Sequence, residues 1–77
     1  MNLHKRGSNL TIKDLTKSEV LVVLDVVTDT PIGSYPELRG FRDPKGEGAE
    51  IFLKFASPLW AESFDRKIRR HDKLVVK

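Results

Sequence analysis

The segment from Glu50 to Phe55 carries residue types suited to binding. Apolar residues at positions 51, 53 and 55 alternate with Glu50, Phe52 and Lys54. Because the side chains of a β-strand point alternately to its two faces, we expect one buried face and one face that exposes Glu50, Phe52 and Lys54. The segment therefore predicts a strand that exposes one aromatic ring between an acidic and a basic side chain. This pattern supports an inference about the fold rather than about the function.

Groups suited to catalysis are few. The chain has no cysteine and two histidines. His4 lies in the N-terminal segment, and His71 follows a predicted helix, whose C-terminal end suits a cationic side chain. The sequence has no Ser/His/Asp spacing, phosphate-binding loop or HExxH motif. We therefore expect a protein that is not an enzyme and that holds no cofactor or metal.

Two chemical alternatives remain open. Asp25 and Asp29 lie one helical turn apart and can share a metal ion, but the sequence offers no further ligands for it. Arg42, Glu50 and Lys54 can form a small nuclease site on the sheet, because such a site needs no motif.

Length and charge restrict the class of protein. The 77 residues suffice for one small domain, and 39% of them are hydrophobic, which is typical of a globular chain. The net charge of +3 is compatible with a polyanionic partner. No apolar run reaches membrane-spanning length, so we expect an intracellular protein of the cytoplasm or nucleus without membrane contact. We expect residues 1–8 to form a flexible arm and residues 9–77 a single domain.

The first half of this domain predicts a strand and then a helix. Alternation over Asn9–Leu15 indicates a half-buried strand. Thr16 and Glu19 then form a capping box, which predicts a helix over residues 17–28. The β-branched run from Val20 to Val27 is also compatible with a buried strand.

The predicted rotation of this helix suggests a partner contact. Helical spacing places one apolar stripe at the core, formed by Val20, Leu21, Leu24, Val27 and Thr28. Val22 and Val26 then lie one turn apart on the opposite, exposed side. This pair is either an ordinary exposed patch or a contact with a second copy or another protein.

The second half predicts a hairpin, a helix and a last strand. Residues 35–42 read as a strand, and Pro36 and Gly40 in it suggest an edge or a bulge. The turn signals at residues 43–48 join it to a strand over residues 49–55. Ser57 and Pro58 start a helix with apolar residues Trp60, Ala61, Phe64 and Ile68, and residues 74–77 can add a short strand.

This order is β-α-β-β-α-β, which predicts an α+β, ferredoxin-like domain: a four-stranded antiparallel sheet with two helices on one face. Over residues 9–77 the chain resembles an RNA recognition motif. Residues 48–55 are similar to the octamer of that family, with Phe52, Leu53 and Phe55 at matching positions. Residues 55–61 resemble its exit into the second helix, and residues 10–15 resemble its first-strand hexamer in their aliphatic positions.

The resemblance implies RNA or single-stranded nucleic-acid binding by the open face of the sheet. Thr11 and Glu50 stand where the family carries aromatic residues, and Gly48 stands where it carries a basic one. Phe52 remains as the base-stacking residue, with phosphate contacts from Lys13, Lys54, Arg42 and Arg39.

The alternative function is a degenerate, RRM-like protein-interaction module. In it the fold is retained, the base platform is lost, and the first helix or the sheet contacts a partner.

Overall fold

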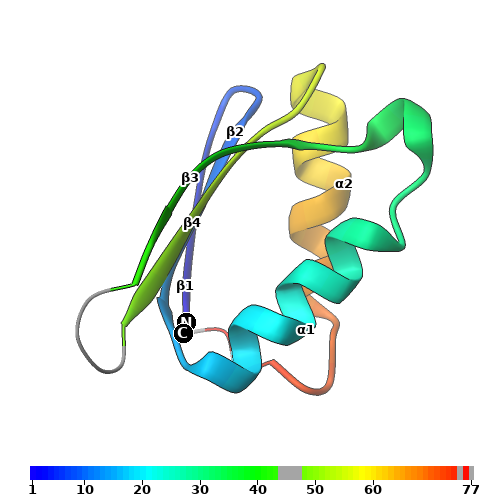
Figure 1. The fold of residues 1–77 in the computed structure, drawn as a ribbon. Helices are drawn as coiled ribbons and strands as arrows, with labels where there is room; N and C mark the ends of the chain where they lie inside the picture. Colours follow the sequence, from blue (N-terminus) through cyan, green and yellow to red (C-terminus); the bar gives the residue numbers. More distant parts are fainter. Residues whose placement is uncertain (44–47, 75, 77) are drawn as a thin grey trace.

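The computed structural model describes residues 1–43, 48–74 and 76 (Figure 1). Along the chain the described elements are β1 (Asn2–Arg6), β2 (Asn9–Leu15), α1 (Lys17–Thr28), a short 3-10 helix η1 (Ile32–Ser34), β3 (Glu37–Arg42), β4 (Ala49–Lys54) and α2 (Pro58–Arg69).

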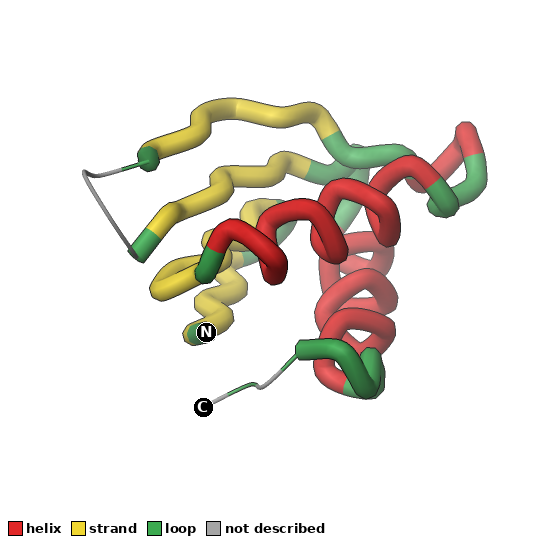
Figure 2. Tube along the Cα trace, turned by 60° about the horizontal axis from the view of Figure 1, so that its bottom comes forward, coloured by secondary structure: helices red, strands yellow, loops and turns green. Residues whose placement is uncertain are grey.

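The strands form one antiparallel sheet in the order β1-β2-β4-β3. Both helices pack on the same side of this sheet and leave its other side uncovered (Figures 1 and 2). The chain is therefore an α+β domain with a two-layer arrangement, as the sequence predicts.

The N-terminal segment is an edge strand, so the expectation of a flexible arm over residues 1–8 is wrong. β1 pairs with β2 from Asn2 opposite Lys13 to Arg6 opposite Asn9. Gly7 and Ser8 form the two-residue connection, and Gly7 has φ +60°, a conformation that glycine adopts without strain. Met1 is only 3% exposed and belongs to the core. The hairpin satisfies the backbone groups of β2 that would otherwise lie at an open edge.

α1 confirms the predicted helix over residues 17–28 and excludes the strand alternative. The backbone N–H of Glu19 donates to Thr16 Oγ1 at 3.2 Å, and the backbone N–H of Thr16 donates to Glu19 Oε1 at 2.9 Å. Both bonds of the capping box are thus present. They satisfy N–H groups that no helical carbonyl can reach.

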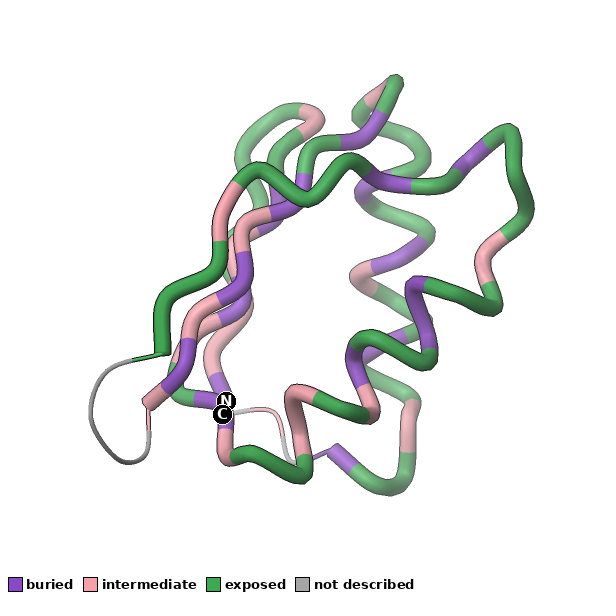
Figure 3. Tube along the Cα trace, in the orientation of Figure 1, coloured by how far each residue is buried: buried purple, intermediate pink, exposed green. Residues whose placement is uncertain are grey.

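The rotation of α1 differs from the prediction, so the predicted partner contact at Val22 and Val26 is wrong. Val26 is 5% exposed and Val23 is fully buried, and Val22 is partly buried against the core. Leu21 is 66% exposed instead. Since α1 is apolar on nearly all sides, helical spacing supports two stripes, and packing against the sheet selects one of them (Figure 3).

β3 is an edge strand with an irregular register, as Pro36 and Gly40 predict. Leu38 lies opposite Leu53 and Gly40 opposite Phe52, so Arg39 is an additional residue in β3, that is, a β-bulge. The antiparallel pairing of β3 with β4 confirms the predicted hairpin. Residues 44–47 of its predicted turn lie outside the described residues.

α2 begins as predicted, with Ser57 Oγ accepting from the backbone N–H of Trp60 at 3.4 Å and Pro58 in the first turn. Its buried stripe consists of Ala61, Phe64 and Ile68, whereas Trp60 remains 44% exposed. The predicted stripe is therefore confirmed except for Trp60.

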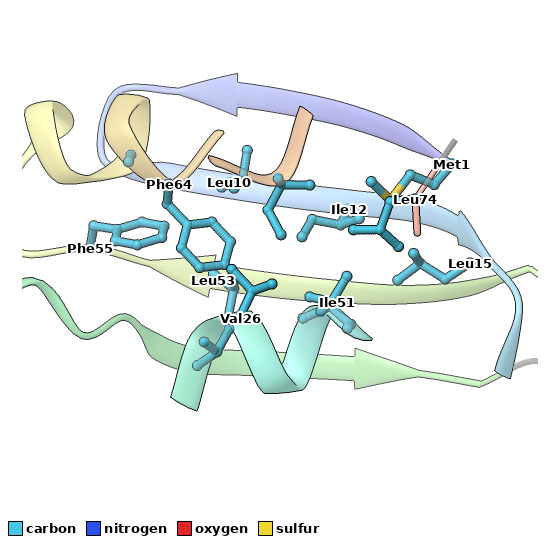
Figure 4. Packing of buried hydrophobic residues seen from close by; sticks show 14 of the residues in the cluster. Met1, Leu10, Ile12, Leu15, Val26, Ile51, Leu53, Phe55, Phe64 and Leu74 are labelled. Carbon is cyan, nitrogen blue, oxygen red and sulfur yellow. The ribbon is translucent and has the colours of Figure 1, made fainter. Parts of the chain in front are cut away.

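The core lies between the helices and the sheet (Figure 4). The rings of Phe55 and Phe64 are 5.3 Å apart between centroids, next to Leu10 and Leu53. At the other end Leu74 is 6% exposed and packs near Met1. Leu74 is not in a strand, and residues 75 and 77 of the predicted last strand lie outside the described residues.

Substitutions on α1 test its rotation. We expect Val26→Asp to lower the free energy of unfolding by about 3 kcal/mol or more, because it buries an unpaired charge. Leu21→Asp is the matched control and should change this free energy by about 0.5 kcal/mol or less. Urea unfolding followed by circular dichroism measures both. Equal losses for the two variants would contradict the observed rotation.

Leucine truncations test whether the N-terminal segment belongs to the fold. Leu3 is partly buried against the core, so Leu3→Ala should cost about 1–2 kcal/mol of stability. Leu59 is 74% exposed, and Leu59→Ala should cost about 0.5 kcal/mol or less. A Leu3→Ala variant with unchanged urea midpoint would indicate that the segment is detached in solution.

Candidate nucleic-acid interface

The side of the sheet that faces away from both helices exposes a continuous polar and aromatic surface, here called the open face. Leu10, Ile12, Ile51 and Leu53 point to the helices and are buried. Because side chains alternate along a strand, the residues between them point to the open face. None of the residues on the open face is buried. They are Asn2, His4 and Arg6 on β1, Asn9, Thr11, Lys13 and Asp14 on β2, Glu50, Phe52 and Lys54 on β4, and Glu37, Arg39, Gly40 and Arg42 on β3.

A row of paired residues crosses the centre of this face. His4 lies opposite Thr11, Thr11 opposite Phe52, and Phe52 opposite Gly40. The Phe52 ring lies over Gly40, where an added Cβ would stand 3.2 Å from Phe52 Cδ2. Glycine thus leaves room for the ring to lie against the edge strand. Phe52 is in consequence half-buried, with its ring held by the sheet.

Charged residues lie on both sides of the aromatic row. Toward one end of the strands Arg6 lies opposite Asn9, and Asn9 opposite Lys54. Toward the other end Lys13 lies opposite Asn2, and Arg42 opposite Glu50. A ligand that crosses the Phe52 ring along the strands therefore meets cations at both ends.

Cations outnumber carboxylates on the open face. The carboxylates are Glu37, Glu50 and Asp14, which accepts a hydrogen bond from the Asn2 side chain. Glu37 Oε2 lies 3.4 Å from Arg39 Nε. Within the part of the chain that the structure describes, Arg6, Lys13 and Lys54 form no ion pair. Because these groups have no anionic partner there, their charge is available to an anionic ligand.

The structure brings all of the predicted nucleic-acid-binding residues together on this one face. Phe52 lies at its centre, with Lys54 on the same strand and Lys13 on β2, and Arg39 and Arg42 come from β3. Alternation predicts the common face of Phe52 and Lys54, whereas Lys13, Arg39 and Arg42 are expected there from the resemblance to an RNA recognition motif.

His4 and Arg6 also belong to the open face, and sequence reasoning missed them. It assigned residues 1–8 to an arm and therefore left them without a partner strand. A signal was present: Gly7-Ser8 between two short alternating segments is typical of a two-residue hairpin turn.

The positive charges on α2 are largely paired with carboxylates of α2 itself and of the end of α1. Arg66 Nη1 lies 2.9 Å from Glu62 Oε1, and Arg69 Nε lies 2.8 Å from Asp65 Oδ1, both one turn apart on α2. Lys67 Nζ lies 3.6 Å from Asp29 Oδ2. These pairs make the exposed side of α2 a weaker anion-binding surface than the open face.

The alternative chemical sites find little geometric support. Arg42 and Glu50 lie directly opposite each other, but Lys54 lies four residues along β4, about 13 Å away. Asp29 is paired with Lys67, and among the described residues no group of three or more His, Asp or Glu side chains is placed to hold a metal ion.

No protein family, curated protein or solved structure shows a significant match to this chain. Within the described chain, neither α1 nor α2 has the length and apolar content needed to cross a membrane.

Proposed function

We propose that this protein binds RNA or other single-stranded nucleic acid on the open face of its sheet. The observation that carries the proposal is the central position of Phe52 on a face that neither α1 nor α2 covers. Phe52 lies between cations that form no ion pair with any described residue. An aromatic ring stacks on any base, and cations on either side follow the phosphates of the strand.

The arrangement of the elements supports this proposal. From β2 to α2 the chain follows the β-α-β-β-α order of a ferredoxin-like domain, and β2 and β4 are the central strands. β1 takes the edge position next to β2, which the C-terminal strand occupies in the βαββαβ order. In the proposed relationship to an RNA recognition motif, the two folds differ in which end of the chain supplies this edge strand: the N-terminal end here, and the C-terminal end in the βαββαβ order.

β1 also compensates in part for the aromatic residue that is replaced by Thr11. His4 is the neighbour of Thr11 on the side away from Phe52. Two strand spacings, about 9–10 Å, separate the Cα positions of His4 and Phe52. The imidazole of His4 therefore offers a second flat group. The row can accommodate two nucleotides, one base stacked on Phe52 and the other on His4, with Thr11 between them.

Glu50 opposes the binding of phosphate. It lies opposite Arg42, which reduces the repulsion without removing it. Base stacking and phosphate contacts thus concentrate on the half of the face with Arg6, Lys54 and Phe52. Affinity should consequently be moderate and strongly dependent on salt.

Loss of the central ring tests the proposal. Phe52→Ala should weaken the binding of a short single-stranded RNA by about 1–3 kcal/mol, the contribution of one stacked base. Trp60→Ala removes an exposed aromatic residue from α2 and should leave binding unchanged. Fluorescence anisotropy with a labelled oligonucleotide measures both, and thermal unfolding verifies that both variants are folded. Equal affinities for Phe52→Ala and the unsubstituted protein would refute binding by the open face.

The salt dependence tests the role of the N-terminal strand. Arg6→Gln should reduce the magnitude of the slope of log K against log salt concentration by about 0.7, since one phosphate contact with a single strand is lost. Arg70→Gln makes the same chemical change beyond the end of α2, on the helix side of the molecule, and should leave the slope as it is. A slope that responds to Arg70→Gln and not to Arg6→Gln would place the nucleic acid on the helices instead.

A further inference from the structure

The edge strand β3 exposes apolar side chains on the side of the sheet that the helices otherwise cover. Leu38 is 55% exposed and Phe41 is 50% exposed, although both point to the helix side. Phe41 lines one wall of an apolar groove of about 300 Å³ beside the first turns of α1. The groove is lined by Leu15, Lys17, Val20, Leu21, Phe41, Asp43 and Ala49.

The bulge at Arg39 sets which residues of β3 share a face. In a regular strand Leu38 and Phe41, three positions apart, would point to opposite sides. The additional residue shifts the phase, so that both lie opposite helix-facing residues of β4, Leu53 and Ile51. By the same shift Glu37 and Arg42 both lie on the open face, at the two ends of β3.

We propose that β3 is the contact between two copies of this chain, paired antiparallel about a two-fold axis between Arg39 and Gly40. In that register Leu38 lies opposite the partner's Phe41, on the helix side. Glu37 lies opposite the partner's Arg42, on the open face. Residues directly opposite each other in an antiparallel pair share a face, so Leu38 meets Phe41 and Glu37 meets Arg42. Arg39 lies opposite the partner's Gly40 and keeps its ion pair with Glu37 of its own strand.

This self-complementarity identifies the occupant as a second copy. An isologous contact needs a surface whose pattern matches itself after a two-fold rotation. In β3 the charged pair Glu37 and Arg42 and the apolar pair Leu38 and Phe41 match in this way. The groove beside Phe41 provides space for apolar atoms that the partner's Leu38 brings to the interface. On its outer side β3 pairs with no strand among the described residues.

The same bulge limits the strength of the contact. Two bulges face each other at the axis, which interrupts the ladder of main-chain hydrogen bonds there. Side chains therefore carry the selectivity, and the dimer should form and dissociate reversibly with concentration. The inference does not depend on the proposed function, since it concerns the free protein.

Charge reversal tests the register. In sedimentation equilibrium from about 10 µM to about 1 mM, the range in which small interfaces associate, the mean mass of the unsubstituted protein should rise toward twice the monomer mass. Glu37→Arg or Arg42→Glu alone places two like-charged pairs in each dimer and should weaken self-association about tenfold. An equimolar mixture of the two variants restores both attractive pairs as a heterodimer. It should recover the association of the unsubstituted protein.

Two further variants keep the test decisive. Glu62→Arg makes the same charge change on α2 and should leave self-association unchanged. Leu38→Ser removes the apolar match without changing charge and should weaken association even if a charge-reversed variant does not fold. A protein that remains monomeric at about 1 mM would overturn the proposal. So would self-association that Leu38→Ser leaves unchanged, or a mixture of the charge variants that associates no better than either alone.

Discussion

The pairing of β2 with β4 is the constraint on which the rest of this structure depends. These central strands present Leu10 and Ile12 beside Leu53 and Ile51 to the helices, all of them buried. A shift of β2 by one residue relative to β4 would move Leu10 and Ile12 to the open face and bring Thr11 into the core. The hydrophobic effect therefore fixes the register, and the register in turn decides which residues are available to a ligand.

Features of the fold that are set by residues close together in the sequence could be predicted, whereas features set by contacts between distant segments could not. The start of α1 is set by Thr16 and Glu19, three residues apart, and such local hydrogen bonds leave a clear pattern. The rotation of α1 is set by contact with the sheet. Because Leu21 and Val26 are similarly apolar, nothing local distinguishes the exposed residue from the buried one. The sequence thus predicts that the helix exists but not which of its sides is buried.

The part of the open face that depends on one strand alone was predictable, and the part that depends on pairing between strands was not. Alternation within one strand places Phe52 and Lys54 on a common face, whatever the neighbouring strands are. The position of His4 depends instead on pairing between β1 and β2, which is settled by the turn at Gly7 and by burial of Met1. A charged and polar N-terminal segment gives little hydrophobic signal for a strand. An edge strand needs less of that signal than a central one, because much of its stabilisation comes from main-chain hydrogen bonds to β2.

The bulge in β3 connects the two surfaces of the molecule. Without the additional residue, Gly40 would point to the helices and Phe41 would join the open face. With it, Gly40 lies beneath the Phe52 ring, and Phe41 remains on the helix side at the sheet edge. One irregularity in the backbone thereby gives the open face its flat centre and gives the edge its matched apolar and charged groups. A change in the conformation of this bulge would alter the support of the Phe52 ring and the edge pattern together, so the proposed base stacking and the proposed self-association depend on the same structural element.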